Sequence, residues 1–172
     1  MNIFFTDADP VKCAIALDDK RVVKMVLEST QLLCTAINEH GGSAPYRSTH
    51  KNHPSAIWAR ESRANFQWLL DHGIALALEY THRFGKIHKC IHVLMDIEEQ
   101  DLVELMPEGG QTAFANCAAH KGLGLSFKHV EPTTDAYKEY LNQRWLTDKR
   151  VPKWTNRNAP KWKNLSNTNT TL

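Results

Sequence analysis

Residues 18–31 read Asp18-Asp19-Lys20-Arg21-Val22-Val23-Lys24-Met25-Val26-Leu27-Glu28-Ser29-Thr30-Gln31 and contain two rows of residues at helical spacing. One row is almost entirely apolar and continues beyond the stretch: Val22, Val26, Ser29, Leu33 and Ile37. The other row is polar: Lys20, Lys24, Glu28 and Gln31. Residues three and four apart share one face of a helix. The stretch therefore predicts an amphipathic helix that runs to about His40 and stops at Gly41-Gly42.

The polar row combines two ammonium groups, a carboxylate and an amide on one surface. Such a surface can hold an anionic substrate and also supply a group for proton transfer. The alternative is a solvated helix face, in which a Lys-to-Glu ion pair contributes only about a few tenths of a kcal/mol. A second polar cluster further along the chain favours the first interpretation.

Helical signals dominate the rest of the chain. Asp9-Pro10 has the pattern of an N-cap followed by a first-turn proline. Residues 55–84 contain no proline and predict one long central helix, bent near Gly73 and closed by Gly85. Alternation with period two is nearly absent, which predicts an all-α fold. Further helices are expected at about residues 10–17, 86–106 and 132–145.

The chain of 172 residues is long enough for one domain with a real core. Its 42% hydrophobic and 23% charged residues are ordinary for a soluble globular protein. We expect a single compact helical domain over residues 1–163, ending in an irregular basic and aromatic segment, and a disordered tail over residues 164–172. Apolar surroundings of the cysteines, the lack of a signal peptide and the lack of a membrane-spanning run predict a cytoplasmic protein, in the host cytoplasm if it is viral.

Positive charge is concentrated near the C-terminus. The net charge of +2 does not by itself indicate a nucleic-acid binder. Between Lys138 and Lys163, however, there are eight basic residues and two acidic ones, with Trp154 and Trp162 interleaved among them. Basic side chains for phosphates and tryptophans for stacking on bases are a common nucleic-acid footprint. Alternatively, the two tryptophans anchor an irregular tail to the core.

The second polar cluster is Thr49-His50-Lys51-Asn52-His53-Pro54, immediately before a predicted helix that carries Arg60 and Arg63. A helix N-terminus offers unpaired N–H groups and a partial positive charge. Together with two imidazoles, an amide and two guanidinium groups, it suits a phosphate or another anion. Alternatively, His50 and Asn52 bond to the loop backbone and the arginines pair with Glu61 or Glu28.

A third cluster places basic and titratable side chains at a predicted helix C-terminus: His82, Arg83, Lys86, His88 and Lys89. These residues either bind an anion or only stabilise the helix dipole. The pairs His50/His53 and His88/His92 have spacings that a zinc site can use, but no cysteine pair or HExxH motif accompanies them. We therefore predict no metal and no cofactor, and a metal-dependent hydrolase is an outside alternative.

The chain lacks the GxxxxGK[ST], GxGxxG and GxSxG motifs, which argues against P-loop, Rossmann and α/β-hydrolase enzymes. It combines Leu-Asp-Asp-Lys-Arg-Val-x-Lys-x-x-x-Glu at residues 17–28 with Asn-His-Pro at residues 52–54 and Trp-Ala-Arg at residues 58–60. This combination resembles the pyrimidine-dimer DNA glycosylase (phage endonuclease V) superfamily and is similar to a group of short, uncharacterised phage proteins. The likeness covers about residues 9–89.

The resemblance implies a compact helical fold and a glycosylase and abasic-site lyase, in which the N-terminal α-amine forms a Schiff base. It implies that Glu28 is the catalytic carboxylate and that the residues around or facing it are Lys20, Arg21, Lys24, His53 and Arg60. The family's threonine at position 2 is replaced here by Asn2, whose size favours retention of Met1. Lys20 or Lys24 is then the substitute nucleophile, if neighbouring cations lower its pKa.

The leading hypothesis is a phage-type, DNA- or nucleotide-directed N-glycosylase/lyase that acts at a cationic pocket. The predicted catalytic residues are Glu28, Lys24, Lys20 and His53. The predicted substrate- and phosphate-binding residues are Arg21, His50, Asn52, Arg60, Arg63, Lys86, His88, Trp154 and Trp162. The alternatives are a counter-defence protein that binds a nucleotide or cyclic nucleotide without chemistry, and a structural module. The expected partner is DNA or a nucleotide and not a membrane, and the sequence assigns no oligomeric state.

Overall fold

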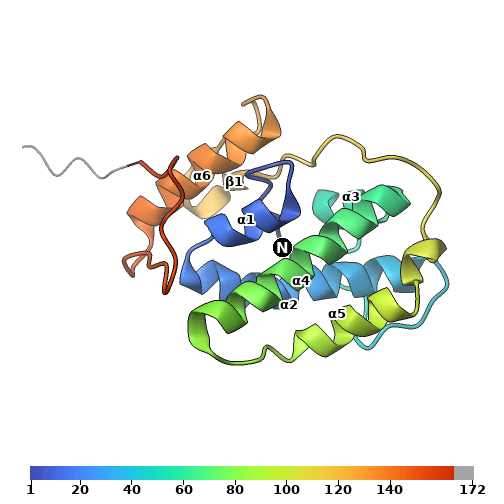
Figure 1. The fold of residues 1–172 in the computed structure, drawn as a ribbon. Helices are drawn as coiled ribbons and strands as arrows, with labels where there is room; N and C mark the ends of the chain where they lie inside the picture. Colours follow the sequence, from blue (N-terminus) through green and yellow to red (C-terminus); the bar gives the residue numbers. More distant parts are fainter. Residues whose placement is uncertain (165–172) are drawn as a thin grey trace, which may run out of the picture.

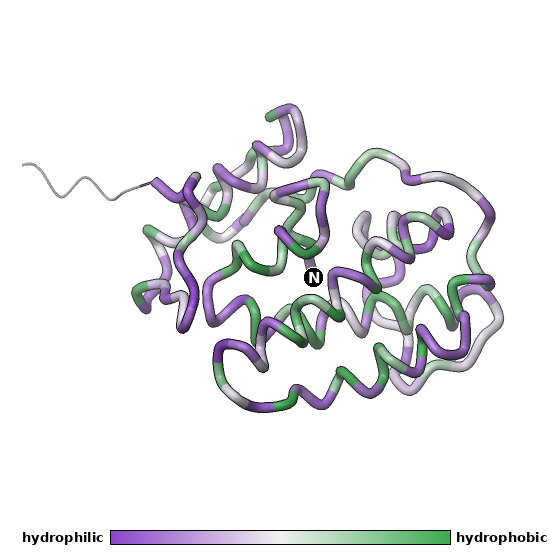
Figure 2. The backbone as a smooth tube through the Cα atoms, in the orientation of Figure 1, coloured by the Kyte–Doolittle hydropathy of each residue, from purple (hydrophilic) through white to green (hydrophobic). Residues whose placement is uncertain are grey.

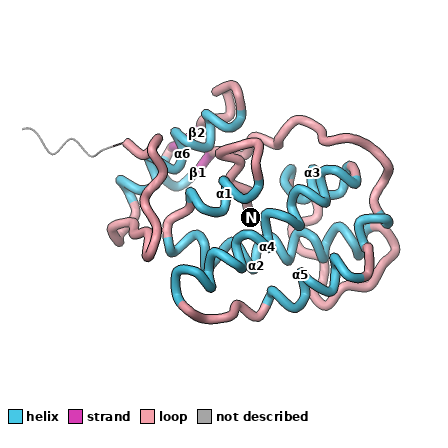
Figure 3. Tube along the Cα trace, viewed as in Figure 1, coloured by secondary structure: helices cyan, strands magenta, loops and turns pink. Residues whose placement is uncertain are grey.

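The computed structural model describes residues 1–164 of the chain. Across these residues it contains six α-helices and one antiparallel two-stranded ribbon (Figures 1 and 3). The helices are α1 (Pro10–Ala16), α2 (Asp19–Glu39), α3 (Pro54–Glu61), α4 (Arg63–Phe84), α5 (Cys90–Glu99) and α6 (Thr133–Thr147). The ribbon and the 3-10 turns are β1 (Ala119–His120), β2 (Leu125–Ser126), η1 (Leu102–Leu105) and η2 (Lys121–Leu123). The predicted helical fold is confirmed, whereas the tail predicted at residues 164–172 lies, apart from Asn164, outside the described residues.

The core of the molecule is built around α2 and α4, which pack side by side (Figure 1). Every member of the apolar row predicted for α2 is buried: Val22, Val26, Ser29, Leu33 and Ile37. Gly73 of α4 allows close packing, because a Cβ there would lie 3.1 Å from a methyl group of Leu94 and 3.6 Å from the Cβ of Ser29. The amphipathic helix predicted from residues 18–31 is therefore confirmed.

The N-terminal residues form a buried lead-in that packs on this core. Phe5 is completely buried and stacks on Phe114, with the ring centroids 4.2 Å apart. Trp58 packs edge-on against the ring of Phe5. Asn2 is held by the buried Tyr137, whose hydroxyl donates a hydrogen bond to Asn2 Oδ1 at 2.7 Å. These contacts fix the start of the chain against α6.

The prediction of one long central helix is wrong at Ser62. The backbone there is extended (φ −153°, ψ 161°), so α3 ends and α4 begins. The Ser62 hydroxyl accepts a hydrogen bond from the N–H of Asn65 at 3.1 Å and caps α4. The N–H of Arg63 donates instead to the carbonyl of Pro107 at 2.9 Å. The predicted end of the helix is confirmed, since Gly85 adopts a φ of 65° and closes α4.

The segment after α6 is irregular and mainly hydrophilic, yet it is attached to the core (Figure 2). Trp154 and Trp162 both pack against Trp145 of α6, with ring centroids 5.0 and 5.5 Å away. Nε1 of Trp154 donates to the carbonyl of Ala16 at 3.0 Å. The tryptophans therefore anchor the segment, as one of the two interpretations of the sequence predicted.

The four cysteines of the chain are free thiols, and three of them are buried. Burial raises the pKa of the Cys13 thiol to about 11. In the part of the chain that the structure describes, no helix is both long and apolar enough to traverse a bilayer.

The buried His72 is expected to make the protein sensitive to moderate acid. Its Nδ1 lies 2.9 Å from the carbonyl of Pro10, and burial lowers the pKa of His72 to about 4. Below about pH 6.5 the unfolded chain binds a proton at His72, whereas the folded protein does not bind it until about pH 4. The contribution of neutral His72 to the free energy of unfolding is therefore complete above about pH 6.5 and is lost as the pH falls towards 4. We expect the loss to be about 3 kcal/mol in the free energy of unfolding, because one pKa unit corresponds to about 1.4 kcal/mol.

Urea unfolding of the wild type and of His72→Gln at several pH values measures this effect. The variant keeps a donor for the carbonyl of Pro10 but cannot titrate, so its stability should fall less between pH 6.5 and 4. His92→Gln, at an exposed position, is the matched control and should follow the wild type. Equal slopes for His72→Gln and the wild type would contradict the prediction.

Candidate nucleotide pocket

A pocket of about 300 Å³ lies beside the N-terminal half of α2. Its walls also include the N-terminal residues, β1 and α6. The charged side chains that line it are Lys20, Arg21, Lys24, Glu28 and Arg144, and His120 and Tyr140 add an imidazole and a phenol. The first three members of the polar row predicted on α2 therefore face one hollow, together with residues from the C-terminal half of the chain.

Glu28 lies inside this pocket, with only 15% of its side chain exposed. Its carboxylate is 3.6 Å from Nζ of Lys24, one helical turn earlier. The Lys24 side chain is 66% exposed, so its ammonium group reaches the mouth of the pocket. A carboxylate and an amine are thus held side by side where a ligand can reach both.

His53 belongs to the electrostatic surroundings of this pocket. It caps α3, because its Nδ1 accepts a hydrogen bond from the N–H of Ser55 at 3.1 Å; the neutral ring therefore carries its proton on Nε2. Burial lowers the pKa of His53, the charges of the N-terminal ammonium and His50 lower it further, and Glu28 opposes them. His50 and Asn52 lie exposed in the preceding loop, where His50 adopts a φ of 49°.

Arg21 faces the pocket but is already engaged within the protein. Its guanidinium lies 3.0 Å from Asp18 and 2.8 Å from Asp148. Asp18 also accepts a hydrogen bond from Nε1 of Trp145 at 2.8 Å. Burial disfavours the charged form of Asp148, but the hydrogen bond and charge of Arg21 outweigh it and lower the pKa of Asp148. Arg21 is therefore part of a buried ion-pair network at the wall of the pocket, and its role in phosphate binding stays a prediction.

Arg60 and Arg63 are not brought to this pocket. Nη1 of Arg60 donates to the carbonyl of Lys51 at 2.7 Å and so braces the loop before α3. Arg63 lies 3.1 Å from Glu104 and 3.3 Å from Glu108. Both arginines therefore hold loops together, but not through Glu61 or Glu28, the partners that the alternative interpretation of this cluster named.

The third cluster also has mainly structural contacts. Nδ1 of His88 accepts a hydrogen bond from the N–H of Cys90 at 3.2 Å, its ring packs edge-on against Tyr80, and burial lowers its pKa. Lys86 is exposed in the turn after α4, where its carbonyl accepts from the hydroxyl of Thr81 at 2.8 Å. Neither His88 nor Lys86 lines the pocket beside α2.

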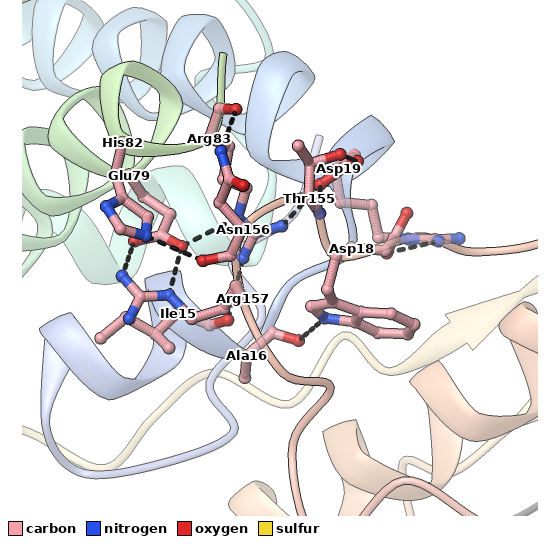
Figure 4. A network of polar contacts seen from close by, with 12 residues as sticks. Ile15, Ala16, Asp18, Asp19, Glu79, His82, Arg83, Thr155, Asn156 and Arg157 are labelled. Carbon is pink, nitrogen blue, oxygen red and sulfur yellow. Dashed lines mark hydrogen bonds and ion pairs between the residues drawn. The ribbon is translucent and has the colours of Figure 1, made fainter. Parts of the chain in front are cut away.

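A buried network ties the C-terminal segment to α4 and α2 (Figure 4). Glu79 accepts hydrogen bonds from Arg83 at 2.8 Å and from Arg157 at 2.8 and 2.9 Å. Arg83 also pairs with Asp19 at 3.1 Å, and Asp19 accepts from the N–H of Thr155 at 2.9 Å. Burial raises the pKa of Glu79, but Arg157 and Arg83 outweigh it, so the net shift is downward.

The pocket residues that were not predicted from the sequence include Arg144, His120 and Tyr140. Arg144 was counted within the basic segment but given no role, and His120 was not singled out. Nδ1 of His120 accepts a hydrogen bond from the N–H of Leu123 at 3.2 Å, which orients the ring in the β1–β2 turn. The excess of basic residues after Lys138 was the signal in the sequence that pointed to the part of the pocket formed by α6. No group of three or more metal-ligating side chains is gathered among the residues described.

Comparison with known proteins identifies the family of the chain. No curated protein and no solved structure matches it. The family model described as pyrimidine dimer DNA glycosylase matches residues 1–92, which is more than half of the 172 residues. The match contains the N-terminal lead-in, all of α2 with Glu28, and His53. It confirms the resemblance read from the sequence, and the chain belongs to the pyrimidine dimer DNA glycosylase family, with a DNA glycosylase-type function.

Proposed function

We propose that the protein is a DNA N-glycosylase with abasic-site lyase activity and that the pocket beside α2 is its active site. One observation carries the proposal: Glu28, largely buried, sits 3.6 Å from the amine of Lys24 in a hollow of about 300 Å³. This volume is at the lower end of the range for small-ligand pockets and suits one nucleotide turned out of the duplex.

The reaction requires an amine and a carboxylate in this position. The amine attacks C1′ of the deoxyribose, the bond from C1′ to the base breaks, and the base leaves with the bonding electrons and takes up a proton. The nitrogen loses one proton, the bond from C1′ to the ring oxygen O4′ breaks, and O4′ takes up a proton, which leaves a protonated Schiff base between the nitrogen and C1′. Removal of a proton from C2′ then breaks the bond from C3′ to oxygen, and the 3′ phosphate leaves with the bonding electrons. Glu28 stabilises the positive charge that develops on the sugar and accepts a proton from the amine. The amines that line the pocket are those of Lys20, Lys24 and the first residue.

Cationic groups and imidazoles around the pocket complete the site. Lys20 is exposed and free to hold a phosphate of the target nucleotide. His53, with its proton on Nε2, donates to the leaving base or to a phosphate, and His50 lies beside it in the loop. In this assignment Arg60, Arg63, Lys86 and His88 have no part in binding the nucleotide.

Borohydride trapping tests the proposal directly. Purified protein is incubated with duplexes containing a pyrimidine dimer or an abasic site, and borohydride is added. We expect strand cleavage and a stable protein–DNA adduct, whose position is found by mapping the modified peptide. Lys89→Ala, an exposed lysine away from the pocket, is the control for Lys20→Ala and Lys24→Ala. Absence of both cleavage and adduct on every substrate, with unchanged ligand in a stoichiometric complex, would favour nucleotide binding without chemistry.

A further inference from the structure

A second cavity, of about 500 Å³, adjoins the proposed active site. The two cavities share three lining residues, Lys20, His120 and Arg144. From these the second cavity extends along the C-terminal end of α6 to Lys149 and Arg150. Apart from Lys20, its walls come from residues beyond position 92, outside the part of the chain that the family model matches.

The walls of the second cavity carry uncompensated positive charge. Lys20, Lys149 and Arg150 are exposed and form no ion pair within residues 1–164. The one carboxylate in the walls is that of Asp148, which already pairs with Arg21 at 2.8 Å and with Arg144 at 3.5 Å. An anion entering the cavity therefore meets free cations, while the acidic group is neutralised from within the protein.

Arg144 is held at the junction of the two cavities. Nη1 donates to the hydroxyl of Tyr140 at 2.8 Å, and the guanidinium carbon lies 5.7 Å from the centre of the same ring. Its buried Nε has no hydrogen-bond partner among the described residues. The guanidinium is fixed in place, and Nη1 and Nη2 each carry a second N–H group that can donate to a phosphate with little loss of side-chain entropy.

We infer that this second cavity binds the phosphodiester backbone of the DNA strand next to the nucleotide in the active site. The inference rests on the proposed function, because it takes the pocket beside Glu28 as the place of the target nucleotide. A strand that enters one cavity passes Lys20 and Arg144 and continues along Lys149 and Arg150. Contacts of this kind position the strand without reading its sequence.

The salt dependence of DNA binding tests the inference. The probe is a short duplex with a tetrahydrofuran abasic-site analogue, which binds without being cleaved. For Lys149→Ala/Arg150→Ala we expect the slope of log affinity against log salt to fall by about 1.8, because each lost phosphate contact removes about 0.9. The ratio of the wild-type affinity for this DNA to that of Lys149→Ala/Arg150→Ala should therefore fall by about tenfold between 50 and 200 mM salt.

Lys12→Ala/Lys161→Ala is the matched control, since it removes the same charge from exposed positions that line neither cavity. Its slope should stay near that of the wild type, and thermal unfolding should show that both double variants are folded. An unchanged slope for Lys149→Ala/Arg150→Ala, or an equal fall in both variants, would overturn the inference. Binding is measured on uncleaved DNA, so a reduced slope in a protein that cleaves nothing would reject the proposed reaction and leave the strand subsite standing.

Discussion

Replacing Glu28 by glutamine is expected to slow base removal by about 10²- to 10⁴-fold, the usual contribution of a positioned acid–base group. Glutamine has the same shape as glutamate but cannot accept a proton or stabilise a cation with a full negative charge. DNA affinity should change by less than about threefold, because phosphate binding depends on other residues and Glu28 repels the phosphates. Single-turnover cleavage and binding of uncleaved DNA, measured on the same preparation, separate the two effects.

Glu39→Gln is the matched control, since it makes the same change on the same helix. Glu39 lies at the C-terminal end of α2 and pairs only loosely with Lys51, at 3.8 Å. The Glu39→Gln variant should cleave DNA at the wild-type rate. If Glu28→Gln also cleaves at the wild-type rate, the carboxylate in the pocket has no catalytic role and the active site must be sought elsewhere. A loss of DNA binding equal to the loss of cleavage would instead make Glu28 a binding residue.

The sequence predicts the helix that carries Glu28 because the signal is local. Two rows with helical spacing lie within the same stretch, and the structure buries one and turns part of the other towards the pocket. The break at Ser62 is not predictable in this way. It is stabilised because the N–H groups of Arg63 and Ala64 find the carbonyls of Pro107 and Gly109, at 2.9 and 3.4 Å, more than forty residues later.

The same limit applies to the cationic residues. Arg21 and Arg63 have the chemistry of phosphate ligands, but each meets carboxylates contributed by a remote loop, Asp148 for Arg21 and Glu104 for Arg63. A sequence shows which side chains can bind an anion, but not whether a carboxylate of the same chain reaches them first. For Arg144 the reverse holds, because folding brings an unassigned basic residue to the pocket.

The Arg83→Ala variant is expected to lose about 3–5 kcal/mol of stability, the usual effect of removing one partner from a buried ion pair. The Arg83 side chain is completely buried, and it lies 2.8 Å from Glu79 and 3.1 Å from Asp19. Its Nη2 also donates to the carbonyl of Ile15 at 3.0 Å. Truncation leaves this carbonyl and part of the charge on Glu79 without compensation in the interior. Urea unfolding of the variant and the wild type measures the loss.

The contacts of Asp19 show where the damage should appear first. Asp19 is held by Arg83 on one side and accepts the N–H of Thr155 on the other, so losing Arg83 should release the C-terminal segment before α2 and α4 separate. We therefore expect the amide of Thr155 to lose protection from hydrogen exchange in Arg83→Ala. Arg47→Ala, at an exposed arginine with no ion pair in the described structure, should change neither stability nor exchange. If Arg83→Ala is as stable as Arg47→Ala, this network does not hold the segment, and the packing of Trp154 and Trp162 on Trp145 must account for its attachment.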